Sequence, residues 1–180
     1  PTAGVRVNPD SAQFELLYNP EFMGALSDDH KLGILMHEFY HLIFEHVTAR
    51  KPADGLKRID NIAMDLAINC HIANELPSEA NPGPTIGKEP MKACIPGEGM
   101  FKDLPPFKTY EWYLEALKKM RDEQQDQEGE GDGKGQPGEP GDGDPFGGMD
   151  SLDDHEGFGE SDGTTEEIAK ERLKDTIKKA

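Results

Sequence analysis

One stretch of this chain, residues 27–47, constrains its fold more than any other. Ser27 is a favourable N-cap residue, and the two aspartates after it suit the positive end of a helix dipole. Apolar residues then fill nearly every side of a helix from Leu32 to Val47, and a helix that is apolar all round is a buried one. The sequence therefore predicts a helix that runs through the core.

The rest of the chain predicts a small α+β fold around this helix. Short β-branched or aromatic stretches predict two strands joined by a turn, and apolar periodicity or capping residues predict three further helices. These are the strands Val5–Val7 and Phe14–Tyr18 and the helices at about 56–76, 109–120 and 164–180. Residues 77–108 are rich in proline and glycine, which predicts a long irregular loop.

The net charge of −17 is concentrated in one segment. Residues 122–162 contain 15 acidic side chains and one lysine, which leaves the rest of the chain near −3. A composition of Gly, Asp, Glu and Pro does not offset the entropy of ordering, so we expect a solvated linker. We accordingly divide the chain into a domain at 1–120, an acidic low-complexity segment at 121–163, and an amphipathic helix at 164–180 that begins whatever follows in a longer protein.

Charge and hydropathy exclude several classes of function. Nucleic acids and anionic membranes require a basic face, and none is concentrated here. No run of apolar residues is long enough to cross a membrane, and the first ten residues lack the pattern of a secretory signal. We expect a soluble, cytoplasmic protein in which Cys70 and Cys94 are free thiols.

The core helix contains the pattern His-Glu-x-x-His at residues 37–41. A helix advances about 100° per residue, so His37 and His41 lie one turn apart on one face and can bind the same zinc ion. Glu38 lies beside them, where it can act as general base toward a water molecule activated by the metal. The alternative is a buried helix with two hydrogen-bonded core histidines and no metal.

His46 is one candidate for the third ligand. It lies nine residues after His37, which places it on the opposite side of an unbroken helix. Residues 42–45 are all compatible with a helix, so the geometry disfavours His46 as a ligand. It is then a histidine at the negative end of the helix dipole.

The favoured candidate is Asp65, on the following helix. Asn61, Asp65 and Asn69 recur every four residues, which forms a polar stripe flanked by isoleucines. In zinc peptidases whose third ligand comes from a following helix, an acidic residue there completes the set and a polar residue one turn away orients a ligand. We therefore predict that Asp65 binds the metal and that Asn61 and Asn69 hold the ligands in place. The alternative is a solvated polar face.

The chain resembles a known family, the "putative metallopeptidase domain" of bacterial and phage proteins, which often precedes a von Willebrand factor A-like domain. The resemblance rests on "HEFYH" followed by His46, on "FELLYNPEF", "NIAMDLAIN" and "YEWYLEAL", and on "DDHEGF" at 153–158. It implies a zincin-like fold and a peptidase activity in which His37, Glu38 and His41 take the motif roles. It also draws attention to His155, as a transition-state donor or an extra ligand. Tyr110 and Tyr113 are lesser candidates.

These patterns lead to two hypotheses about function. The first is a zincin-like α+β peptidase that binds one Zn²⁺ ion and hydrolyses a peptide or protein substrate with Glu38 as general base. The second is a non-catalytic module stabilised by metal, which binds a partner such as an ATPase or a von Willebrand factor A-like domain. Both hypotheses predict bound zinc, so they differ in the role of Glu38.

Overall fold

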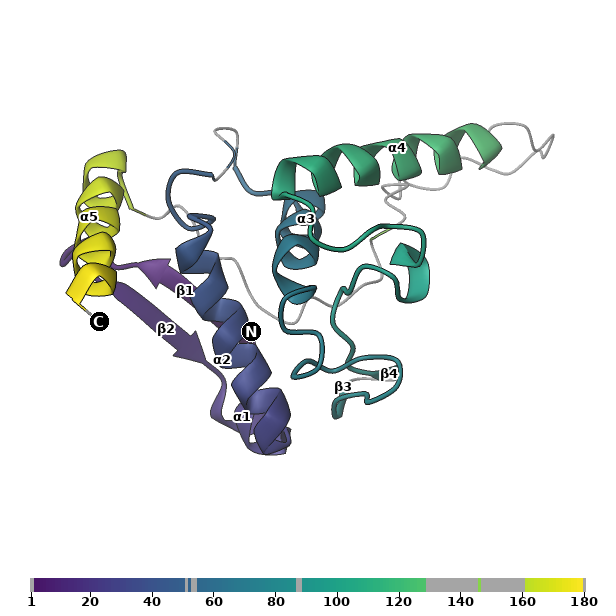
Figure 1. Ribbon diagram of the computed structural model, residues 1–180, viewed down its shortest axis with the longest axis horizontal. Helices are drawn as coiled ribbons and strands as arrows, with labels where there is room; N and C mark the ends of the chain where they lie inside the picture. The colour runs from purple at the N-terminus through teal and green to yellow at the C-terminus, as the bar shows by residue number, and fades with distance from the viewer. Residues whose placement is uncertain are drawn as a thin grey trace, which may run out of the picture.

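The computed structural model describes residues 2–50, 52, 55–86, 89–128, 146 and 161–179. Its helices and strands are β1 (Ala3–Val7), β2 (Phe14–Tyr18), α1 (Pro20–Ala25), α2 (Asp28–Ile43), α3 (Arg58–Asn69), β3 (Thr85–Ile86), β4 (Glu89–Pro90), the 3-10 helix η1 (Gly99–Phe101), α4 (Tyr110–Glu128) and α5 (Gly163–Lys179). Helix α2 lies in the middle, between the β1–β2 hairpin with α5 on one side and α3 with α4 on the other (Figure 1). No helix in these ranges is long and apolar enough to span a membrane.

The β1–β2 hairpin forms where the sequence predicts two strands. The strands are antiparallel, with Val5 opposite Leu16. The Asn8 carboxamide oxygen accepts hydrogen bonds from two backbone N–H groups of the turn, those of Asp10 and Ser11, both at 2.9 Å. Strand β1 is largely buried and packs on α2, whereas the last three residues of β2 are exposed.

Helix α2 begins as its sequence predicts, because the Ser27 hydroxyl accepts a hydrogen bond from the backbone N–H of His30 at 3.2 Å. The prediction that this helix is buried all round is wrong. Strand β1 and helix α3 cover only part of its surface, and a stripe of large apolar side chains on α2 is 42–51% exposed, namely Leu32, Leu35, Phe39 and Ile43. The metal motif lies on the covered face.

Helix α2 ends at Ile43, four residues earlier than predicted. Glu45 adopts a left-handed backbone conformation, with φ of 60°. The backbone N–H of His46 donates to the carbonyl of His41 at 3.0 Å, and that of Glu45 donates to Leu42 at 3.1 Å. These two bonds define a Schellman motif, which usually has glycine where this chain has Glu45. The motif turns the chain back toward α2.

Helices α3 and α4 build the larger core cluster. Helix α3 ends at Asn69, and residues 70–76 form turns rather than the continued helix that the sequence predicts. Leu66 of α3 packs in one cluster with Tyr113 and Leu117 of α4, all three with no exposed surface. Phe146, from the segment expected to be a solvated linker, is also buried in this cluster.

Helix α5 packs against the hairpin instead of standing apart from it. Its Ala169 is fully buried in a small cluster with Val5, Val7 and Val47. Lys170 forms an ion pair with Glu45 at 3.1 Å. The Asp162 carboxylate caps the helix by accepting a hydrogen bond from the backbone N–H of Thr165 at 2.8 Å, two residues before the helix start that the sequence predicts at residue 164. The three-part division of the chain stays a prediction, with α5 in contact with the first part.

Gly33 allows the close approach of α2 to the turns after α3. A Cβ atom on Gly33 would overlap the backbone carbonyl of Glu75. We expect Gly33→Ala to lower the free energy of unfolding by about 2–4 kcal/mol, as overpacking against fixed backbone does. Urea denaturation measures the change. Gly24→Ala is the control, because its Cβ meets nothing within 4 Å and alanine favours helix α1; equal effects of the two changes would contradict this account.

Candidate metal centre

Three donor atoms from α2 and α3 converge in the interior. His37 Nε2 lies 3.0 Å from His41 Nε2, and Asp65 Oδ1 lies 3.6 Å from each of these nitrogens. The three side chains are at most 1% exposed. They form a His-His-Asp group of the kind that binds a metal ion. The structure thus brings together the three residues that the sequence predicts as ligands.

The spacing of these donors fits a zinc ion. Zinc prefers tetrahedral coordination with bonds to nitrogen and oxygen of about 2.0–2.2 Å, which separates neighbouring donors by roughly 3.3 Å. The separations of 3.0 and 3.6 Å lie on either side of that value. A zinc ion held by these two imidazoles and one carboxylate would have a fourth coordination position for water or substrate, as catalytic zinc sites do.

Asn69 holds the His37 ring with its Nε2 atom toward His41 and Asp65. The Asn69 amide nitrogen donates to the Cys94 carbonyl at 2.9 Å, so the Asn69 oxygen faces His37 Nδ1 at 2.7 Å. That oxygen only accepts, so Nδ1 of His37 is the protonated nitrogen. The lone pair of a neutral His37 is therefore on Nε2, which points at His41 and Asp65.

His46 supports His41 from the side away from the donor cluster. The prediction that His46 faces the opposite side of an unbroken helix is wrong, because the Schellman turn at Glu45 reverses the chain. His46 is fully buried, and its Nδ1 lies 3.1 Å from Nδ1 of His41. When His41 donates its Nδ1–H to Nδ1 of His46, the lone pair of a neutral His41 is on Nε2, which faces His37 and Asp65. The sequence carries no glycine signal for this turn.

The other predicted site residues have different surroundings. Glu38 is 1% exposed and follows His37 on the covered face of α2. The side-chain oxygen of Asn61 is buried and has no hydrogen-bond partner in the part of the chain that the structure describes. His155 lies outside the described residues.

Tyr110 and Tyr113 are held by other contacts. The Tyr110 hydroxyl donates to Asp60 at 2.9 Å, and the Tyr113 hydroxyl donates to the Pro105 carbonyl at 2.8 Å. Burial raises the pKa of Tyr113 to about 12, so its phenol stays protonated. Cys70 and Cys94 are free cysteines, as predicted. Burial also raises the pKa of the Cys70 thiol, which keeps it in the unreactive form.

Comparison with known families agrees with this geometry. Residues 5–179 match the sequence profile of a family described as "putative metallopeptidase domain". The chain belongs to this family. The family match covers α5 as well as the metal cluster, and its description agrees with a metal-dependent function for the His-His-Asp group.

One relative and the solved structures say less about function than the family match does. An uncharacterized protein of Thermotoga maritima is 28% identical over 112 residues, which is 58% of this chain and 28% of the relative. The chain therefore matches less than a third of that protein's length. No solved structure matches the chain.

Asn69 provides a test of the metal centre. We expect Asn69→Ala to weaken zinc affinity about 10–100-fold, because His37 loses the partner that fixes its tautomer and ring orientation. Competition with a chromophoric chelator measures the affinity. Asn81→Ala is a matched control, since Asn81 also contacts a histidine ring, His30, at 3.1 Å but away from the cluster. An unchanged affinity in Asn69→Ala would show that this contact does not support metal binding.

Proposed function

We propose that this domain is a zinc-dependent peptidase with a zincin-like arrangement. The observation that carries the proposal is the meeting of His37, His41 and Asp65 donor atoms within 4.8 Å of one another, with Glu38 buried on the same helix. Two histidines and a glutamate on one helix, with an acidic ligand from the next helix, are the elements that hydrolysis of a peptide bond by activated water requires.

Each residue has a defined task in this proposal. His37, His41 and Asp65 hold the ion, and Asn69 and His46 orient the two imidazoles through their Nδ1 atoms. A bound zinc ion would lower the pKa of a water molecule and polarise the scissile carbonyl. The Glu38 carboxylate takes the proton from the attacking water and delivers it to the leaving amine. His155 remains a candidate donor to the developing oxyanion.

Zinc-dependent cleavage tests this function directly. The zinc-loaded protein is incubated with unfolded proteins and peptide libraries across a range of pH, and products are identified by mass spectrometry. We expect cleavage that a chelator abolishes and that zinc restores. If no substrate is cleaved in the presence of zinc at any pH, the peptidase proposal fails.

The burial of the donors favours a second function. His37, His41 and Asp65 are nearly inaccessible to solvent, as in structural metal sites that stabilise a fold. In this alternative the domain is a metal-stabilised module that acts with an ATPase or a von Willebrand factor A-like domain. Chelation then lowers the melting temperature, as it does under the first proposal, but no zinc-dependent cleavage is found and replacing Glu38 leaves partner binding unchanged.

A further inference from the structure

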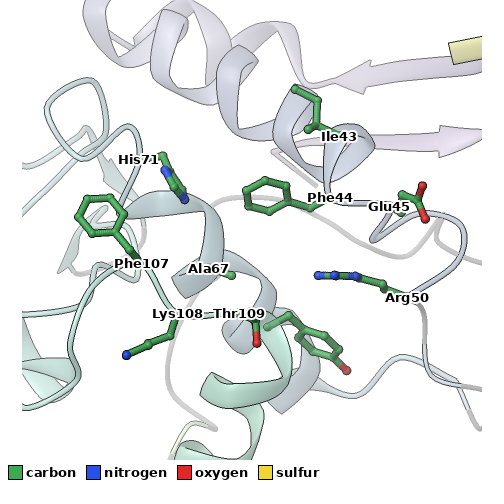
Figure 2. A pocket seen from close by; sticks show the side chains of 10 residues that line it. Ile43, Phe44, Glu45, Arg50, Ala67, His71, Phe107, Lys108 and Thr109 are labelled. Carbon is green, nitrogen blue, oxygen red and sulfur yellow. The ribbon is translucent and has the colours of Figure 1, made fainter. Parts of the chain in front are cut away.

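A cavity of about 530 Å³ lies where the ends of α2 and α3 meet the start of α4. Four aromatic or imidazole rings line it, those of Phe44, His71, Phe107 and Tyr110. Figure 2 shows Phe107 and His71 at one end of the space, with Phe44 and Arg50 pointing toward it from the other side. A concave site with ring walls and a few polar groups is the usual form of a ligand pocket.

Backbone strain is concentrated at this cavity. Three non-glycine residues in the described part of the chain have positive φ, and two of them, Glu45 and Phe107, line the cavity. Phe107 has φ of 60° although its side chain is bulky, and the residue is 66% exposed. Its ring contacts His71, with centroids 5.2 Å apart. An exposed ring held by unfavourable backbone indicates a functional position for that ring.

The charge of the cavity contrasts with that of the protein. The chain has a net charge of −17, yet Arg50 and Lys108 both line this space. Glu45, the acidic side chain of the lining, is paired with Lys170 at 3.1 Å. Arg50 is paired with Glu111 at 3.8 Å, and because both side chains are about half exposed this pair is weak. The Lys108 ammonium lies over the Trp112 ring, 5.7 Å from the ring centroid, and Trp112 does not line the cavity. Arg50 is therefore the cation that the cavity offers to an acidic group on a ligand.

The cavity is close to the metal centre. Its Phe44 ring lies 5.8 Å from the His46 ring, and the His46 ring lies 5.1 Å from the ring of the ligand His41. On the other side, the cavity residue Ala67 follows Asp65 by two positions. An extended peptide covers about 3.3–3.6 Å per residue, so a peptide cleaved at the metal would reach the cavity with a side chain only a few positions from the cleaved bond.

We propose that this cavity selects the peptide substrate by binding a large apolar side chain with an acidic side chain beside it. The rings of Phe44, His71 and Phe107 pack around the apolar group, and Arg50 attracts the carboxylate. The identification of the ligand as a substrate rests on the proposed peptidase function. Binding to the cavity is measured separately from cleavage.

Peptide binding to zinc-loaded Glu38→Gln protein tests the cavity without turnover. The probes are fluorescein-labelled hexapeptides with one phenylalanine followed by aspartate, alanine or lysine, and anisotropy gives Kd. We expect the aspartate peptide to bind most tightly. Adding Phe107→Gly raises its Kd about 10-fold without lowering Tm, because glycine relieves the strained φ. Adding Arg50→Glu instead shifts the preference from aspartate to lysine.

Two controls separate the cavity from general surface effects. Met100→Ala removes another exposed apolar side chain of the same connection between α3 and α4, and Lys119→Glu reverses an exposed charge on α4; neither residue lines the cavity. Both should leave Kd unchanged. The cavity proposal is overturned if no probe binds, or if Phe107→Gly and Arg50→Glu have no larger effect than the controls. If these two variants act as expected but wild type cleaves nothing, the cavity proposal stands and the peptidase function fails.

Discussion

Glu38→Gln is expected to lower kcat for peptide cleavage by about 10²–10⁴-fold, the usual contribution of a positioned general base. Glutamine has nearly the same shape as glutamate but does not accept a proton from water at neutral pH. The variant should keep its fold and bind one zinc ion with wild-type stoichiometry, since the proposed donors are His37, His41 and Asp65. Single-turnover kinetics together with metal analysis by mass spectrometry measure both properties.

The control for this change is Glu115→Gln. Glu115 lies on α4, its side chain is 76% exposed, and it pairs with Lys118 at the surface. The Glu115→Gln protein should cleave peptides at the wild-type rate. A Glu38→Gln protein that retains both zinc and full turnover would exclude Glu38 as the base. A protein that loses zinc would show instead that Glu38 supports the metal site.

Asp65→Ala is expected to remove zinc binding almost completely, because it deletes the carboxylate that lies 3.6 Å from both imidazole nitrogens. His46→Ala should weaken zinc affinity by only about 10–100-fold, since His46 contacts His41 through Nδ1 and not through the metal-facing Nε2. Zinc stoichiometry after dialysis, and affinity from chelator competition, compare the two variants.

Loss of zinc must be separated from loss of fold in this comparison. The circular dichroism spectra and melting temperatures of both variants are therefore compared with those of chelator-treated wild type, which lacks the metal but keeps all its side chains. If His46→Ala lost the metal and Asp65→Ala kept it, the assignment of ligands would be wrong. Equal losses would show that orientation of His41 matters as much as the carboxylate.

Much of the metal centre could be predicted from local periodicity. His37 and His41 share a helix face because they are four residues apart, and Asp65 and Asn69 share a face of α3 for the same reason. The N-cap of α2 at Ser27 could also be predicted, because a serine hydroxyl at this position accepts a hydrogen bond from a backbone N–H of the first helical turn. The coordination of a metal ion and the roles of Glu38 and His155 stay predictions.

The errors arose where long-range packing overrides local preference. Residues 42–45 are compatible with a helix, yet the chain turns at Glu45, where α5 supplies Lys170 as a partner from more than a hundred residues away. The apolar residues of α2 predict burial, yet four of them are exposed because the two-stranded sheet and α3 leave one face uncovered. No short segment of the sequence contains both sides of these contacts, so local patterns do not predict them.

By itself the sequence determined which candidate donors lie on the same face of each helix, since the 3.6-residue period of a helix sets which side chains share a face. The tertiary structure alone decided how closely α2 approaches the turns after α3, which depends on Gly33. It alone also decided the turn at Glu45 that places His46 against His41. It also decided the cavity beside the centre, which is lined by residues from Ile43 to Tyr110. Residues so distant along the chain meet only when the whole domain packs, because their contacts depend on the burial of shared apolar surface.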